Sequence, residues 1–231
     1  MQKRNNQQTV KAKMAKTFGY RRQEIVQKQP TAEEILVRWP ALLLMEEINA
    51  EFLRITTVPL EATFLAQLDK HSTKLLEVIR RKGGRVKEQT SRILQVVDET
   101  VDITIKREAV LKALMIYLGE PVEHLFKEYQ DEQEDDQLQL ETMAIFVTGR
   151  EDPFCPPKDI KTIIDGTQVL DDVPSVATAV AMFFGLIYAL NLKYPKNLQY
   201  TLEFFQKILM ELGGKNMSSK VYRLSTQLHS C

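Results

Sequence analysis

The most hydrophobic stretch of the chain runs from Val173 to Leu192, where twenty successive residues carry no charge. A helix that is apolar on all sides must be enclosed, either by protein or by lipid. The strongly apolar part, Val176–Leu190, has about the length of a buried core helix, and its flanks lack the aromatic and basic belts of a membrane span. We therefore predict a buried core helix over 174–192, with a membrane helix as the alternative.

A second helical pattern follows a break at Lys193-Tyr194-Pro195. Over residues 195–212 apolar side chains recur at steps of three and four, which is typical of an amphipathic helix with one buried face. The apolar positions are Leu198, Leu202, Phe205, Ile208, Leu209 and Leu212. The two helices are joined by a short proline-containing turn, so the pattern predicts an αα-hairpin.

Just before these helices the pattern changes to one typical of β-strands. Met143–Thr148 and Ile160–Val169 are rich in Ile, Val, Thr and Phe, and Asp165-Gly166 is a two-residue turn signal. We expect a small antiparallel sheet covered by the αα-hairpin, because a sheet with one apolar face needs a cover. The predicted fold class is mainly α with a small β element, an α+β fold.

The preceding part of the chain reads as helical. Thr31 and Glu34 form a capping box that starts a helix, and Trp39-Pro40 interrupts it. Further helices are expected at about 40–56, 60–81, 91–101 and 106–118, followed by a short one from Pro121 to Tyr129. Five acids within residues 131–136 indicate a solvated linker. The predicted organisation is a flexible basic arm (1–30), a helical region (31–130), an acidic linker (131–141) and a small α+β region (142–231).

Charge is balanced overall but unevenly distributed. The chain has 31 basic and 31 acidic residues, whereas residues 1–30 hold eight basic residues and one acid, a local charge of +7. Such an arm is either a solvated tail or a contact for nucleic acid, and we favour the tail. The positions predicted to touch nucleic acid or a partner are Arg21, Arg22, Lys13 and Lys16. Aromatic residues do not interleave with these charges, so a base-stacking platform is missing.

The search for catalytic chemistry gives no positive result. Nucleotide-binding glycine motifs and paired Glu-x-x-His metal motifs are absent. Three histidines and two cysteines are scattered, which argues against zinc and against a disulfide framework. Cys155 lies in a predicted loop and His124 could fold near it, but a lone loop cysteine is usually inert. Glu46, Glu47 and Glu51 are interpreted as ordinary exposed acids of a helix. We predict no catalytic, cofactor-binding or metal-binding residue, and no enzyme.

Several sequence blocks point to a family. They are Arg21–Ile25, Arg38–Leu42, Glu47–Phe52, Gly185–Asn191, Tyr194-Pro195, Tyr200-Thr201 and Phe205–Lys207. Together they resemble the C-terminal region of a multicopy group of mostly uncharacterised vertebrate proteins similar to sterile-alpha-motif-domain-containing proteins. The resemblance covers the chain from about Phe18 onward and implies no catalytic residue. A sterile alpha motif itself is not recognisable, so its self-association is not implied.

These observations favour a non-enzymatic, intracellular protein-interaction or scaffolding module, in the cytoplasm or the nucleus. The intracellular expectation rests on the two cysteines and on the lack of an apolar signal segment after Met1. The alternative is a nucleic-acid-associated regulator that uses the basic arm and originates from a mobile element. A protein is the expected partner, a membrane is not expected, and no cofactor is expected.

Overall fold

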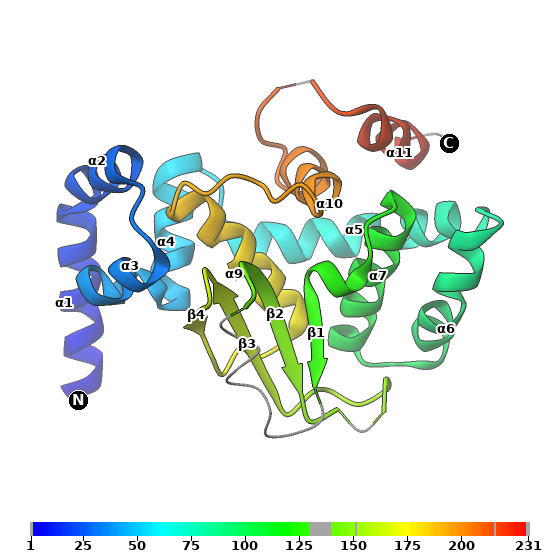
Figure 1. The fold of residues 1–231 in the computed structure, drawn as a ribbon, viewed down its shortest axis with the longest axis horizontal. Helices are drawn as coiled ribbons and strands as arrows, with labels where there is room; N and C mark the ends of the chain where they lie inside the picture. Colours follow the sequence, from blue (N-terminus) through cyan, green and yellow to red (C-terminus); the bar gives the residue numbers. More distant parts are fainter. Residues whose placement is uncertain (1, 130–139, 151, 215, 230–231) are drawn as a thin grey trace.

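A computed structural model of the chain describes residues 2–129, 140–150, 152–214 and 216–229. Helices dominate it, and a four-stranded sheet lies against one side of the helical body (Figure 1). The predicted α+β class is therefore confirmed. The helices are α1 (Gln2–Lys16), α2 (Phe18–Lys28), α3 (Ala32–Arg38), α4 (Met45–Thr56), α5 (Leu60–Arg80), α6 (Arg85–Glu99), α7 (Ile103–Leu118), α9 (Val176–Ala189), α10 (Gln199–Phe204) and α11 (Ser219–His229). Most of the predicted acidic linker falls on residues 130–139, outside the described part.

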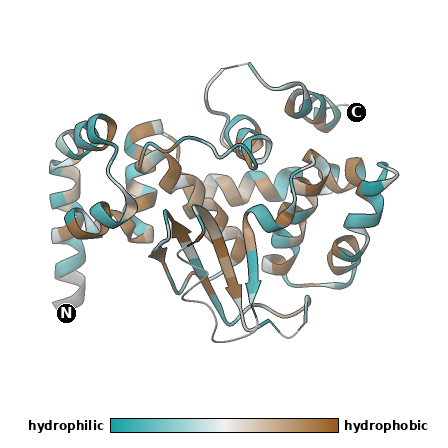
Figure 2. Cartoon of the chain, viewed as in Figure 1, coloured by the Kyte–Doolittle hydropathy of each residue, from teal (hydrophilic) through white to brown (hydrophobic). Residues whose placement is uncertain are grey.

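The apolar stretch forms α9, and every residue of this helix except Tyr188 is buried. The helix begins where the Ser175 hydroxyl accepts a hydrogen bond from the Thr178 amide (3.1 Å), and it ends before Asn191, whose φ is +56°. Hydrophobic residues concentrate in α9 and in the strands beside it (Figure 2). None of the helices in the described ranges is both long enough and apolar enough to cross a membrane.

Helices α4 and α5 enclose α9 from one side and strands β2 and β3 from another, so the amphipathic helix predicted over 195–212 is not the main cover of α9. Gly185 makes the approach of α4 and α5 possible. A Cβ atom on Gly185 would lie 2.3 Å from Leu60 Cδ2 and 2.8 Å from Ile48 Cγ2. A larger residue there would have to displace the side chains of two helices.

The sheet has the order β1-β2-β3-β4, with β1 parallel to β2 and the other pairs antiparallel, so it is mixed rather than purely antiparallel as predicted. The strands are β1 (Phe126–Tyr129), β2 (Met143–Thr148), β3 (Asp159–Ile164) and β4 (Thr167–Leu170). The Asp165-Gly166 turn joins β3 to β4, with both residues at positive φ, as predicted. The short helix expected from Pro121 to Tyr129 is wrong: a 3₁₀ turn, η2 (Val122–His124), is followed by β1. Pairing with β2 decides the conformation, and no local pattern signals it.

The segment after α9 also differs from the prediction of one helix over 195–212. Regular helix begins only at Gln199, and α10 passes into a π-helical turn, η3 (Phe205–Leu209). The start is fixed by Glu120, whose buried carboxylate accepts hydrogen bonds from the amides of Tyr200 (2.8 Å) and Thr201 (2.9 Å). This carboxylate satisfies amides that the first turn of a helix leaves free, although it comes from a distant segment.

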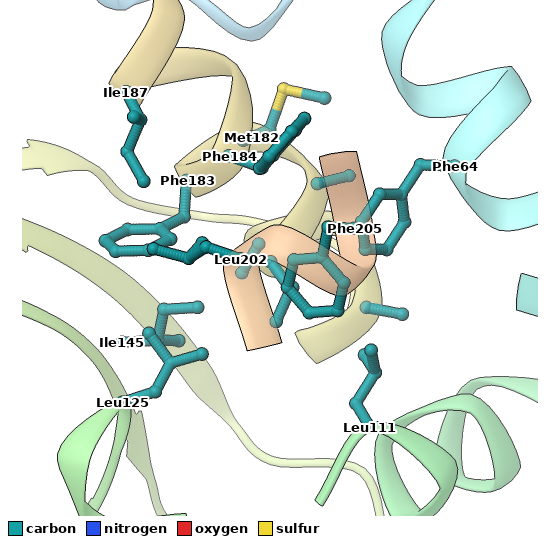
Figure 3. Close-up of a cluster of buried hydrophobic side chains, with 14 of the residues drawn as sticks. Phe64, Leu111, Leu125, Ile145, Met182, Phe183, Phe184, Ile187, Leu202 and Phe205 are labelled. Carbon is teal, nitrogen blue, oxygen red and sulfur yellow. The ribbon is translucent and has the colours of Figure 1, made fainter. Parts of the chain in front are cut away.

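One continuous core ties these parts together. Phe205 of η3 packs edge-on against Phe64 of α5, with ring centroids 5.1 Å apart, and against Phe184 of α9 at 6.1 Å. Side chains from α5, α7, α9, β2 and α10 meet around these rings (Figure 3). The predicted helical and α+β regions therefore share one core in the described part of the chain.

Candidate interaction surface on the N-terminal helices

The basic segment expected to be a flexible arm forms the two helices α1 and α2, which lie at one end of the molecule beside α3 and α4 (Figure 1). Its local signals are weak, because α1 offers few apolar side chains. Met14 and Ile25 are nevertheless buried, at 4% and 0% exposure. Contacts with the rest of the chain therefore hold a segment whose composition alone predicts a tail.

Arg21 anchors α2 inside the protein. Its guanidinium is fully buried and donates two hydrogen bonds to the Glu51 carboxylate on α4, from Nε to Oε1 (3.0 Å) and from NH2 to Oε2 (2.5 Å). Further donors of the same group reach the Thr17 hydroxyl (2.9 Å) and the Met14 carbonyl oxygen (3.2 Å). The guanidinium also lies 5.5 Å from the Trp39 ring centroid. A buried pair of this kind holds only because both charges are hydrogen-bonded.

Arg22 points to a different element, the C-terminal end of the core helix α9. It donates hydrogen bonds to the carbonyl oxygens of Tyr188 (2.9 Å) and Ala189 (3.4 Å) and to Asn191 Oδ1 (3.2 Å). A cation at this position satisfies free carbonyl groups and complements the negative end of the helix. Burial lowers the pKa of the Arg22 guanidinium below its ordinary value, partly offset by the charge of Glu51.

The four positions predicted to bind nucleic acid or a partner are therefore not gathered on one surface. Arg21 and Arg22 are engaged within the fold, whereas Lys13 and Lys16 are exposed on α1. The reading of Glu47 and Glu51 as exposed acids is wrong, because they are 4% and 0% exposed. A signal for this burial exists in the sequence: both acids directly precede the apolar residues of the inward face of α4.

Glu24 organises the region where α2 meets α3. Its carboxylate accepts hydrogen bonds from Arg38 Nε (2.7 Å), Lys28 Nζ (3.0 Å) and Trp39 Nε1 (3.1 Å). The bonds from Arg38 and Lys28 lower the pKa of the Glu24 carboxyl group to about 2. Glu24 therefore stays ionised at neutral pH, where a negative charge is paired with two cations. The sequence pattern predicts no contact for Glu24 and indicates Trp39 only as part of a helix break.

Exposed apolar side chains gather on the same helices. The described exposed apolar residues of this segment are Tyr20, Val26, Leu36, Val37 and Leu44, with exposures from 43% to 80%. Two hollows lie on the same helices, and Leu44 and Val37 each border one of them. One, of about 950 Å³, is bordered by Val10 of α1 and Leu44 before α4, and the other, of about 580 Å³, by Val37 and Trp39. The second hollow is also bordered by two cations and three carboxylates, so its rim is polar.

Residues considered for catalysis lie elsewhere. Cys155 is exposed in a turn in which its amide donates to the Asp152 carbonyl oxygen (2.9 Å). His124 Nδ1 lies 3.3 Å from the carbonyl oxygen of Asn197, and Cys155 is not among its hydrogen-bond partners in the described ranges. Within those ranges no three His, Cys, Asp or Glu side chains are placed to hold a metal ion.

Residues 1–44 match a family model described as the helical domain of sterile alpha motif domain-containing protein 3. The match covers α1, α2 and α3 and ends just before α4. It supports a relation of this part of the chain to sterile-alpha-motif-containing proteins. The resemblance to a C-terminal region of multicopy vertebrate proteins stays a prediction. No curated protein and no solved structure matches the chain.

Proposed function

We propose that the chain is a non-enzymatic protein-interaction module and that it contacts its partner through α1, α2, α3 and the start of α4. The observation that carries this proposal is that these helices expose several apolar side chains and that two of them, Leu44 and Val37, each border a hollow. A surface patch of this kind, rimmed by polar residues, marks interaction sites more often than ordinary surface. The family match of residues 1–44 falls on the same helices.

The anchoring of these helices supports the proposal energetically. A docking surface gains affinity when its side chains are already held in the bound arrangement, because less conformational freedom is lost on binding. Arg21 fixes α2 to α4, Arg22 fixes α2 to the end of α9, and Glu24 fixes α3 to α2. Arg21 is thus paired with Glu51, and Glu24 with Arg38, within the fold.

The alternative, a nucleic-acid-associated regulator, rests on the charge of residues 1–30. Lys13 and Lys16 remain exposed on α1 and could contact phosphates. Arg21 and Arg22 are already committed to Glu51 and to α9, which leaves this alternative fewer cations than the sequence offers. We therefore rank it second.

The test is affinity capture of the full chain from cells, with and without nuclease, using wild type and two valine variants. Val37→Glu introduces a charge beside the second hollow, where Val37 is 80% exposed. Val101→Glu is the matched control, because Val101 is also exposed and lies between α6 and α7. We expect Val37→Glu to lose captured proteins that wild type and Val101→Glu retain, regardless of nuclease.

Two outcomes would overturn the proposal. Equal capture by Val37→Glu and Val101→Glu would show that the surface is not the docking site. Loss of all captured proteins from wild type after nuclease treatment would favour the nucleic-acid alternative. Equal melting temperatures of the two variants would exclude unfolding as the cause of a difference, since both substitutions are at exposed positions.

A further inference from the structure

A small basic hollow lies at the other end of the molecule from the N-terminal helices. It has a volume of about 220 Å³ and is formed where the C-terminal end of α7 meets the first turn of α11 and the residues that follow α5. Lys82, Lys220 and Arg223 border it, together with Ser219, Tyr117 and the backbone around Gly119. No carboxylate is among the residues that border it.

The three cations are not neutralised by acids in the described part of the chain. Lys220 Nζ donates to the Leu118 carbonyl oxygen (3.0 Å) and lies 4.3 Å from the Tyr200 ring centroid. Lys82 Nζ lies 5.9 Å from the Tyr117 ring centroid. Neither Lys82 nor Arg223 forms an ion pair with a described residue, whereas the neighbouring Arg80 is paired with Asp98 (2.5 Å). Three like charges bordering one hollow create a local positive potential that an anion would relieve.

We propose that this hollow binds a phosphate monoester, carried by a phosphorylated serine or threonine of the protein partner. The hollow is smaller than the pockets of drug-sized ligands, which start at about 300 Å³, but it accommodates a phosphoryl group. A guanidinium and two ammonium groups are the donors that proteins use for phosphate. The Ser219 hydroxyl also borders the hollow and adds a further donor, whereas the Ser218 amide at the start of α11 already donates to the Glu203 carboxylate (2.6 Å). The proposal rests on the proposed function, since it assumes a protein partner.

The arrangement favours a single dianion over a nucleic-acid backbone. A nucleic acid carries one charge per phosphodiester and is usually held by cations spread along a groove. Here the cations border one point instead. A phosphate monoester has a second pKa near 6 and carries up to two negative charges at neutral pH. Because a phosphate monoester loses a charge between pH 7.5 and pH 5.5 and a phosphodiester does not, the pH dependence of binding distinguishes the two ligands.

The probe is N-acetyl-O-phosphoserine N-methylamide, titrated into the full chain at pH 7.5 and at pH 5.5 and followed by two-dimensional NMR. We expect saturable shifts at Ser219, Lys220 and Arg223, with weaker binding at pH 5.5 because the ligand loses its second charge. The residues that border the hollow include lysine, arginine and tyrosine but no histidine, aspartate or glutamate.

Lys82→Gln and Arg223→Gln should each weaken binding about tenfold, the effect of one charge-assisted hydrogen bond. The matched controls are Lys196→Gln and Arg92→Gln, which remove exposed cations away from the hollow and should leave binding unchanged. All four positions are exposed, so equal melting temperatures are expected.

Three results would overturn the inference. The first is no saturable shift up to 20 mM ligand, and the second is equal weakening by the controls. The third is binding of duplex DNA at physiological salt that does not depend on pH and that is lost in Arg223→Gln. That result would assign the hollow to nucleic acid. These readouts use purified protein and a synthetic ligand, so they are independent of the capture result for Val37→Glu. If phosphoserine binds and Val37→Glu still captures the same proteins as wild type, the hollow remains supported and only the N-terminal docking surface is rejected.

Discussion

Replacing Arg21 tests whether the basic N-terminal segment is an integral part of the fold. Arg21 and Glu51 are both fully buried, and removing one partner of such a pair typically costs about 3–5 kcal/mol, because the other charge is left uncompensated. The two single variants should differ. After Arg21→Met, Glu51 still accepts a hydrogen bond from Arg54 (2.9 Å), so we expect a loss of about 3 kcal/mol.

After Glu51→Leu, by contrast, Arg21 keeps only neutral partners, the Thr17 hydroxyl and the Met14 carbonyl. We expect a loss of about 5 kcal/mol. In a chain of this size each kcal/mol corresponds to about 2–4 °C, so the melting temperature should fall by about 6–12 °C for Arg21→Met and about 10–20 °C for Glu51→Leu. The double variant should be more stable than either single variant, because no buried charge of the pair remains.

The assay is urea unfolding followed by circular dichroism, with Lys13→Met as the control for removing an exposed cation from the same segment. Lys13→Met should stay within about 0.5 kcal/mol of wild type. A lower m-value in Arg21→Met would indicate that α1 and α2 detach before the rest unfolds. If Arg21→Met is as stable as Lys13→Met, the segment is not docked through Arg21, and the reasoning is refuted.

Three further predictions follow from single contacts. Gly185→Ala should cost about 1–3 kcal/mol, because its Cβ would overlap Leu60; an unchanged urea midpoint would contradict this packing. Glu24 has a folded-state pKa of about 2 against an ordinary value of 4.5, so it stabilises the protein above pH 4.5 and progressively less toward pH 2. The free energy of unfolding of Glu24→Gln should therefore fall less than that of wild type between pH 4.5 and pH 2. An equal fall in both proteins would contradict the Glu24 contacts. Glu120→Ala should destabilise the protein by about 1–3 kcal/mol by leaving the Thr201 amide unpaired, measured against Glu123→Ala as an exposed control.

Elements with local signals could be predicted from the sequence. Thr31 accepts from the Glu34 amide and Glu34 returns the bond, as the capping box requires, and Asp165-Gly166 makes the predicted hairpin turn. The apolar run of α9 likewise identified the centre of the core. Each of these signals lies within a few residues of the element that it defines.

The parts that could not be predicted depend on partners distant in sequence. Strand β1 exists through its pairing with β2, and α10 starts where Glu120 supplies its cap. The basic segment is held against the fold by Glu51, which lies thirty residues after Arg21 and accepts two hydrogen bonds from it. Composition reports how many charges a segment has but not which of them are paired. The sequence therefore could not show that Arg21 and Arg22, which are predicted to contact a partner, bind to other parts of the same chain.

The distribution of unpaired charge separates the two proposed surfaces. At the N-terminal end Arg21 and Arg22 are engaged inside the fold, and the exposed surface carries apolar side chains such as Val37 beside the exposed Lys13 and Lys16. At the end formed by α7 and α11, Lys82 and Arg223 lack acidic partners among the described residues and face one hollow. The two surfaces lie at opposite ends of the molecule (Figure 1). Substitutions at such separated sites act additively. If both surfaces contact one partner, the double variant Val37→Glu/Arg223→Gln should therefore lose affinity equal to the product of the two single losses, whereas a smaller combined loss would show that they are coupled.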